Sequence, residues 1–82
     1  MPNPHPLKHR ELLKRLRGFG VVEVKGGKGS ERILGMQGGL EAGKYKGPQI
    51  TIKDHGGGTM HSVRVVDAVL RRFAIRPEDF WM

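Results

Sequence analysis

The sequence contains no cysteine, and that absence removes several kinds of chemistry at once. No disulfide can staple the fold, no thiol can act as a nucleophile, and cysteine-based zinc clusters are excluded. Aromatic residues are scarce, at 6% of the chain. No apolar run reaches the roughly 20 residues that a membrane-spanning helix needs, so we expect no membrane partner.

Acidic residues are also in short supply. Eight Asp and Glu stand against 15 Lys and Arg, which gives a net charge of +7 on 82 residues. A small domain this basic favours polyanionic partners, above all RNA, and fast encounter that depends on salt. The alternative is a charged surface that serves solubility alone, on a subunit that binds a protein partner and no RNA.

The N-terminal segment, MPNPHPLKHR, lacks the apolar stretch of a secretion signal. We therefore expect a cytoplasmic protein. Three prolines fall within residues 1–6, which predicts a flexible tail followed by a single domain over residues 7–82. His5 and His9 are expected to be solvated, because they lie in or beside this tail.

Hydrophobic periodicity predicts two amphipathic helices and three strands between them. The first helix runs from Leu7 to a glycine stop at Gly18 or Gly20, and the second follows an N-cap at Ser62. The strands are expected at residues 20–25, 31–36 and 49–54, with a glycine-rich loop over 37–48 and a last turn opened by Pro77.

This order, α-β-β-β-α, predicts an α+β fold in which both helices cover one face of a three-stranded antiparallel sheet. Alternation along the strands assigns six apolar side chains to the helix-covered face: Val22, Val24, Leu34, Met36, Ile50 and Ile52. The same alternation places Val21 and Glu23 on the opposite face. The predicted register pairs Leu34 with Ile52.

The order and spacing of several short motifs resemble a known family. They are ELLKRLRGFG, GGKGSE, IKDHG, VRVVDAVLRRFAI and PEDFW, and together they cover residues 7–81. The arrangement is similar to that of the HicA family of mRNA-interferase toxins. The resemblance implies a double-stranded-RNA-binding-domain-like fold, endoribonuclease activity on mRNA, no cofactor, and neutralisation by a HicB-like antitoxin. The family's catalytic histidine would stand at position 31, where this chain has Glu31, and His55 matches a second histidine of the family pattern.

Glu31 and His55 are the candidate catalytic residues. The predicted register brings them opposite each other, where Glu31 could deprotonate a ribose 2′-hydroxyl and His55 could protonate the leaving oxygen. No metal is required for this chemistry. The alternatives are an ordinary surface pair and an RNA-binding module without activity.

Basic side chains around this pair are expected to contact RNA phosphate, and the candidates are Lys25, Lys28, Arg32, Lys53 and, on the first helix, Arg15. Phe73, Phe80 and Trp81 could stack on bases. Their position after a helix at the chain end favours closure of the core instead.

Overall fold

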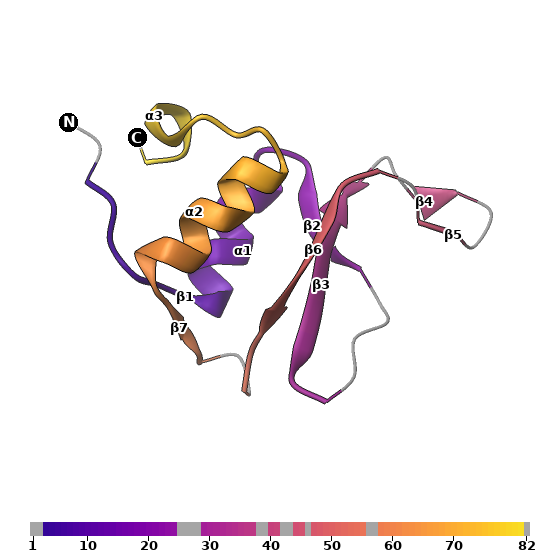
Figure 1. Ribbon diagram of the computed structural model, residues 1–82, viewed down its shortest axis with the longest axis horizontal. Helices are drawn as coiled ribbons and strands as arrows, with labels where there is room; N and C mark the ends of the chain where they lie inside the picture. The colour runs from indigo at the N-terminus through magenta and orange to yellow at the C-terminus, as the bar shows by residue number, and fades with distance from the viewer. Residues whose placement is uncertain are drawn as a thin grey trace.

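The computed structural model describes residues 3–24, 29–37, 40–41, 44–45, 47–55 and 58–81. Two helices, three longer strands and several short elements make up this part of the chain (Figure 1). In chain order they are β1 (Leu7–Lys8), α1 (His9–Arg17), β2 (Val21–Val24), β3 (Glu31–Met36), β4 (Leu40–Glu41), β5 (Lys44–Tyr45), β6 (Gln49–Lys53), β7 (Met60–His61), α2 (Val63–Arg72) and α3 (Pro77–Phe80).

The main sheet has the strand order β2-β3-β6 and is antiparallel throughout. Both α1 and α2 lie on the same side of it (Figure 1), as the amphipathic patterns predict. Their apolar stripes and the inner face of the sheet form one core, whose fully buried members include Leu12, Leu16, Leu34, Val66 and Val69. The predicted α+β arrangement of a helix, an antiparallel meander and a second helix is therefore confirmed.

Local signals set the helix ends. The hydroxyl of Ser62 accepts a hydrogen bond from the backbone N–H of Val65 at 3.3 Å and so caps α2, as predicted. Helix α1 ends at Arg17, and Gly20 follows with φ of 81°, a left-handed conformation that suits glycine. Arg72, in the last turn of α2, donates to the carbonyl of Gln49 at 2.8 Å and ties this helix to β6.

The first helix begins two residues later than predicted. Leu7 and Lys8 form β1 instead, which pairs antiparallel with β7 through Leu7 and His61. The extended backbone of Lys8 then leads directly into α1. Burial explains the difference: Leu7 is 3% exposed in this short strand.

The predicted register between β3 and β6 is wrong by two residues. Leu34 lies opposite Ile50, Arg32 opposite Ile52, and Glu31 opposite Lys53. A shift of two residues keeps every side chain on its original face, so the hydrophobic pattern cannot distinguish the two registers. The register therefore depends on long-range packing that alternation does not report.

The predicted facing of β2 is also wrong. Val21 lies opposite Met36 and Glu23 opposite Leu34, so Val21 and Glu23 share the helix-covered face with Leu34. Val21 is 1% exposed. Alternation favours the pair Val22 and Val24 for the inner face, because the other pair includes Glu23. The inner face is available to Glu23 because His9 and Arg32 lie there as polar partners.

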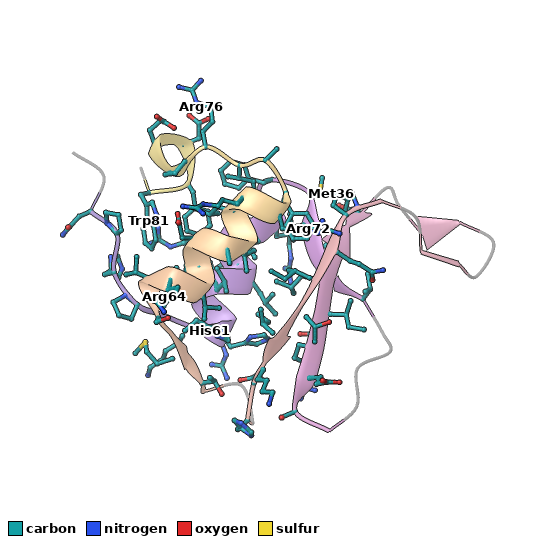
Figure 2. The ribbon with its side chains drawn as sticks, viewed as in Figure 1. Met36, His61, Arg64, Arg72, Arg76 and Trp81 are labelled. Carbon is teal, nitrogen blue, oxygen red and sulfur yellow. The ribbon has the colours of Figure 1, made fainter. Side chains whose placement is uncertain are left out.

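At the C-terminus, Phe80 and Trp81 are 4% and 7% exposed and close the core beside α1, which confirms that prediction. Trp81 lies between α3 and the N-terminal segment (Figure 2), where the ring of His5 approaches it at 5.1 Å between centroids. Within the predicted glycine-rich loop, β4 and β5 form a two-residue antiparallel pair. Across the residues described, no helix is long and apolar enough to cross a membrane.

Candidate functional site

The predicted catalytic residues lie near the same end of the sheet without facing each other. Glu31 opens β3 on the outer face, directly across from Lys53. His55 follows the end of β6, and its backbone N–H donates to the hydroxyl of Thr59 at 2.6 Å. The hairpin pairing continues beyond the strands, since Asp54 N–H donates to the carbonyl of Ser30 at 2.8 Å. Ser30 therefore lies opposite Asp54, and Glu31 lies two residues away from the position opposite His55.

The candidate RNA-binding residues divide into two groups. Arg32 and Lys53 lie with Glu31 at the end of β3 and β6. Arg15 lies on α1, and its guanidinium carbon lies over the rings of Phe80 and Trp81, 5.9 Å and 5.7 Å from their centroids. Figure 1 places α3 far from the Glu31 end of the sheet, so Arg15 does not join that group. Lys25 and Lys28 fall outside the described residues.

A polar cluster of two buried histidines and a glutamate whose side chain is 38% exposed, which the sequence did not predict, lies on the helix-covered face. His9 contributes from the first turn of α1, Glu23 from β2 and His61 from β7. His9 and His61 are each 4% exposed, so the expectation that His9 is solvated is wrong. The fold brings His9 inward because β1 pairs with β7, and because His9 N–H donates to the carbonyl of Thr59 at 2.8 Å.

Each ring nitrogen of His9 has its own partner. Nδ1 lies 3.0 Å from Nε2 of His61, and Nε2 lies 3.2 Å from a carboxylate oxygen of Glu23. An ionised carboxylate can only accept a hydrogen bond, so Nε2 of His9 carries a proton. One of the two facing nitrogens in the His9–His61 contact must donate and the other accept. The result is a hydrogen-bonded chain from Glu23 through His9 to His61.

Asp54 and Arg32 border this chain. Asp54 is 3% exposed and accepts a hydrogen bond from Thr59 N–H at 3.3 Å. Its other carboxylate oxygen lies 3.9 Å from Nε2 of His9 and 4.0 Å from Nε of Arg32. The Arg32 guanidinium also donates to the backbone carbonyls of Gly29 and Glu31. Arg32 thus connects the buried cluster to the exposed hairpin end.

Burial lowers the pKa of His61 below its usual range, and the neighbouring His9 lowers it further, while Asp54 acts in the opposite direction. Because the ordinary value is about 6.5, the His61 imidazole is largely neutral at pH 7. A neutral imidazole with one free nitrogen can accept a proton, so the cluster is suited to acid–base chemistry.

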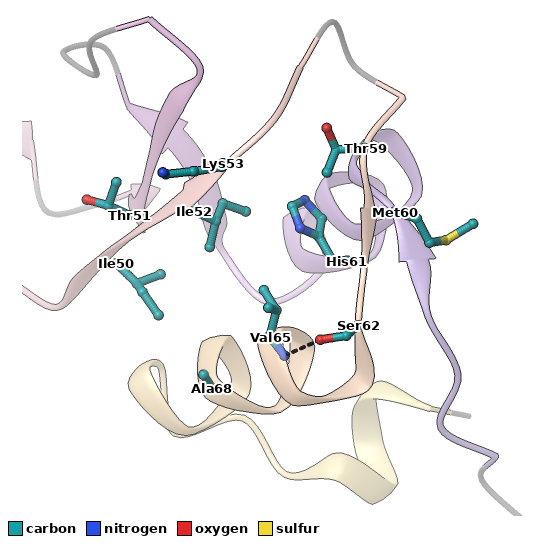
Figure 3. A pocket seen from close by; sticks show the side chains of 10 residues that line it. All are labelled: Ile50, Thr51, Ile52, Lys53, Thr59, Met60, His61, Ser62, Val65 and Ala68. Atoms are coloured by element: carbon teal, nitrogen blue, oxygen red, sulfur yellow. Dashed lines mark hydrogen bonds between the residues drawn. The ribbon is translucent and has the colours of Figure 1, made fainter.

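His61 also lines a hollow of about 530 Å³ between β6, β7 and α2 (Figure 3). Ile50, Ile52 and Lys53 line it from β6, and Thr59 lines it from the segment before β7. The ring of His61 projects from β7 into the space between the two strands (Figure 3). A hollow of this size is large enough for a nucleotide-sized group.

Two signals could have revealed the cluster in the sequence. Both histidines stand at element boundaries, His9 where a helix begins and His61 immediately before the Ser62 cap. Glu23 interrupts an otherwise apolar strand, and a charge on a buried face requires partners. Among the residues that the structure describes, no cluster of three or more His, Cys, Asp or Glu side chains has the geometry to hold a metal ion.

Comparisons with models of protein families, with curated proteins and with solved structures found no match to this chain.

Proposed function

We propose that this chain is an RNA-binding endoribonuclease of the HicA type, with a double-stranded-RNA-binding-domain-like fold, neutralised in the cell by an acidic HicB-like antitoxin. The α-β-β-β-α order with both helices on one face supports the fold assignment. The net charge of +7 supports RNA as the partner.

The observation that carries the proposal is the composition of the hairpin end formed by β3 and β6. Glu31, Arg32 and Lys53 occupy adjacent positions there, and the Lys53 side of the same end borders the hollow. A lysine that lines a hollow, with an arginine on the neighbouring strand, suits a phosphodiester backbone that lays one nucleotide into the hollow. An antitoxin that covers this end would need complementary acidic charge.

A second candidate function is RNA binding without cleavage. Glu31 stands where the resembled family has its catalytic histidine, and it lies directly across the sheet from Lys53. Opposite charges at such positions form an ordinary stabilising cross-strand pair. A chain in which this pair replaces the catalytic residue would retain RNA binding and lose activity.

Salt dependence tests RNA binding. Fluorescence anisotropy with a single-stranded RNA oligomer should give a slope of log K against log salt of about −3 to −4 for four to six neutralised phosphates. Lys53→Gln should reduce the magnitude of this slope by about 0.7. Arg71→Gln is a matched control, because the Arg71 side chain is 82% exposed on α2, away from the hairpin end. A flat salt response would defeat the proposal.

Cleavage separates the two candidate functions. The purified protein should cut a labelled RNA in the presence of a chelator, because the proposed chemistry requires no metal. If RNA binds with the expected salt slope and remains intact over a broad pH range, the binding module is the correct assignment.

A further inference from the structure

One wall of the hollow between β6, β7 and α2 is formed by a histidine with a free ring nitrogen. Nε2 of His61 is engaged by His9, which leaves Nδ1 with no hydrogen-bond partner in the described part of the chain. No buried side-chain nitrogen or oxygen in that part lacks a partner, so Nδ1 has accessible surface, and His61 itself lines the hollow. A ligand in the hollow can therefore contact this atom.

The protons behind His61 can be arranged in one continuous order. When Nδ1 of His61 is free to accept a proton, Nε2–H of His61 donates to Nδ1 of His9, and Nε2–H of His9 donates to Glu23. If Nδ1 then gains a proton, the proton on Nε2 can move across the 3.0 Å contact to His9. The positive charge then lies 3.2 Å from the Glu23 carboxylate, which stabilises it.

We propose that His61 is the general base that removes the 2′-hydroxyl proton of a ribonucleotide bound in this hollow, with His9 and Glu23 as positioning residues. This inference rests on the proposed RNA-cleaving function and assigns its catalytic residue. The substrate is a single-stranded RNA segment with one nucleotide in the hollow, whose apolar members, Ile50, Ile52 and Val65, provide a surface for the base.

The reaction is a transesterification. The 2′-hydroxyl gives its proton to Nδ1 of His61, and the 2′-oxygen attacks phosphorus to form a new P–O bond while the bond to the 5′-oxygen breaks. The departing 5′-oxygen takes a proton from water, and the resulting hydroxide is neutralised by the proton that the histidine pair holds. The products are a 2′,3′-cyclic phosphate and a 5′-hydroxyl, and no oxidant or reductant is involved.

His61 meets two requirements of a general base that Glu31 does not meet. It lines an open hollow of about 530 Å³ that can receive a ligand, whereas Glu31 lies exposed on the outer face of the sheet. It also has an orienting partner, because His9 fixes its ring as the third group of a catalytic triad does. The base in this chain would then lie on β7, away from the position that the resembled family uses.

The decisive variant is His61→Gln. A glutamine amide can occupy the place of Nε2 and keep the contact with His9, while it removes the titratable nitrogen. The cleavage rate should fall by about a hundredfold or more, the usual contribution of a general base, and the RNA Kd should stay within a few-fold of the original. His5→Gln is the matched control, since His5 is an exposed histidine outside the cluster, and its rate should be unchanged.

The pH–rate profile tests the positioning residues. The charged groups packed against the histidine pair are Glu23 on β2 and Asp54 after β6, and Arg32 on β3 contacts both of these carboxylates. Lys53 on β6 lines the same hollow as His61. Glu23→Gln removes the carboxylate that stabilises the protonated pair. The acidic limb of the profile should therefore move to lower pH, a change that a purely structural role would not produce.

The outcomes separate this inference from the proposed function. If His61→Gln cuts RNA at the original rate, the inference is overturned while the endoribonuclease stands. If the original protein binds RNA and does not cut it, both the endoribonuclease and the inference fall. If His61→Gln does not fold, Glu23→Gln decides the matter, and an unmoved acidic limb overturns the inference.

Discussion

Replacing Trp81 with alanine should remove a large share of the stability of this small domain. The Trp81 side chain is 7% exposed, contacts Phe80 edge-on at 5.0 Å between centroids and lies beneath the Arg15 guanidinium. A tryptophan buries about 150–250 Å², which at about 25 cal/mol per Å² corresponds to about 4–6 kcal/mol. The alanine methyl keeps part of this, so we expect a loss of about 3–5 kcal/mol.

This loss is a large fraction of the total free energy of unfolding. A domain of 82 residues has a total stability of about 4–12 kcal/mol. The melting temperature of a domain this size falls by about 4–8 °C per kcal/mol, so Trp81→Ala should melt at least about 12 °C lower. Thermal unfolding followed by far-ultraviolet circular dichroism measures the shift, and urea titration gives the change in unfolding free energy.

RNA affinity, measured on the same variant below its melting temperature, provides the contrast. A core residue should leave the affinity of the folded fraction nearly unchanged. Arg15→Met removes the cation–π contacts together with the exposed ion pair to Glu11 at 3.3 Å, and should cost only about 1 kcal/mol. A shift of less than about 4 °C together with a tenfold loss of RNA affinity would refute the argument and make Trp81 a stacking platform.

Three further predictions concern the hairpin end, the buried histidine and the second helix. Glu31→His restores the residue type of the resembled family, and a gain of RNA cleavage by an otherwise inactive chain would identify this protein as a silenced member. If Glu31 and His55 are instead the acid–base pair of an active chain, Glu31→Gln and His55→Ala should each slow RNA cleavage by about a hundredfold. The pKa of His61 is lowered in the folded state, so the unfolded chain binds more protons than the folded chain as the pH falls through about 6.5. The melting temperature should therefore drop between about pH 7.5 and 5.5, and His61→Gln should reduce that drop. Ser62→Ala removes the cap on Val65 N–H and should cost about 1 kcal/mol in urea unfolding, whereas Ser62→Gly should cost only a few tenths; equal losses would exclude the capping role.

The sequence predicts the elements of this fold well because their signals are local. Ser62 caps α2 as expected, Gly20 adopts the left-handed conformation that follows the helix stop, and the stripe from Leu12 to Leu16 is buried. These features require only a few consecutive residues to agree. The two errors in the sheet, the facing of β2 and the register of β6, involve choices between arrangements that satisfy the same alternation.

The site was harder to predict because it depends on contacts between distant segments. His9, Glu23 and His61 come from three elements, and each looks unremarkable beside its neighbours in the chain. His9 in particular follows a proline-rich segment that suggests a solvated tail. Only the pairing of β1 with β7 turns it inward, and that pairing involves two residues on each side, too few to produce a periodic signal.

The pairing of β1 with β7 has a consequence for the order in which the protein forms. The His9–His61 contact joins residues 52 positions apart, whereas β2 and β3 are neighbours in the chain. Closing a long loop costs entropy before the contact is gained, so this junction is expected to form after the meander has folded. During synthesis, a nascent chain that has not yet released β7 from the ribosome lacks both the second histidine and the wall of the hollow. Any activity that depends on them therefore begins only after β7 has emerged and paired with β1.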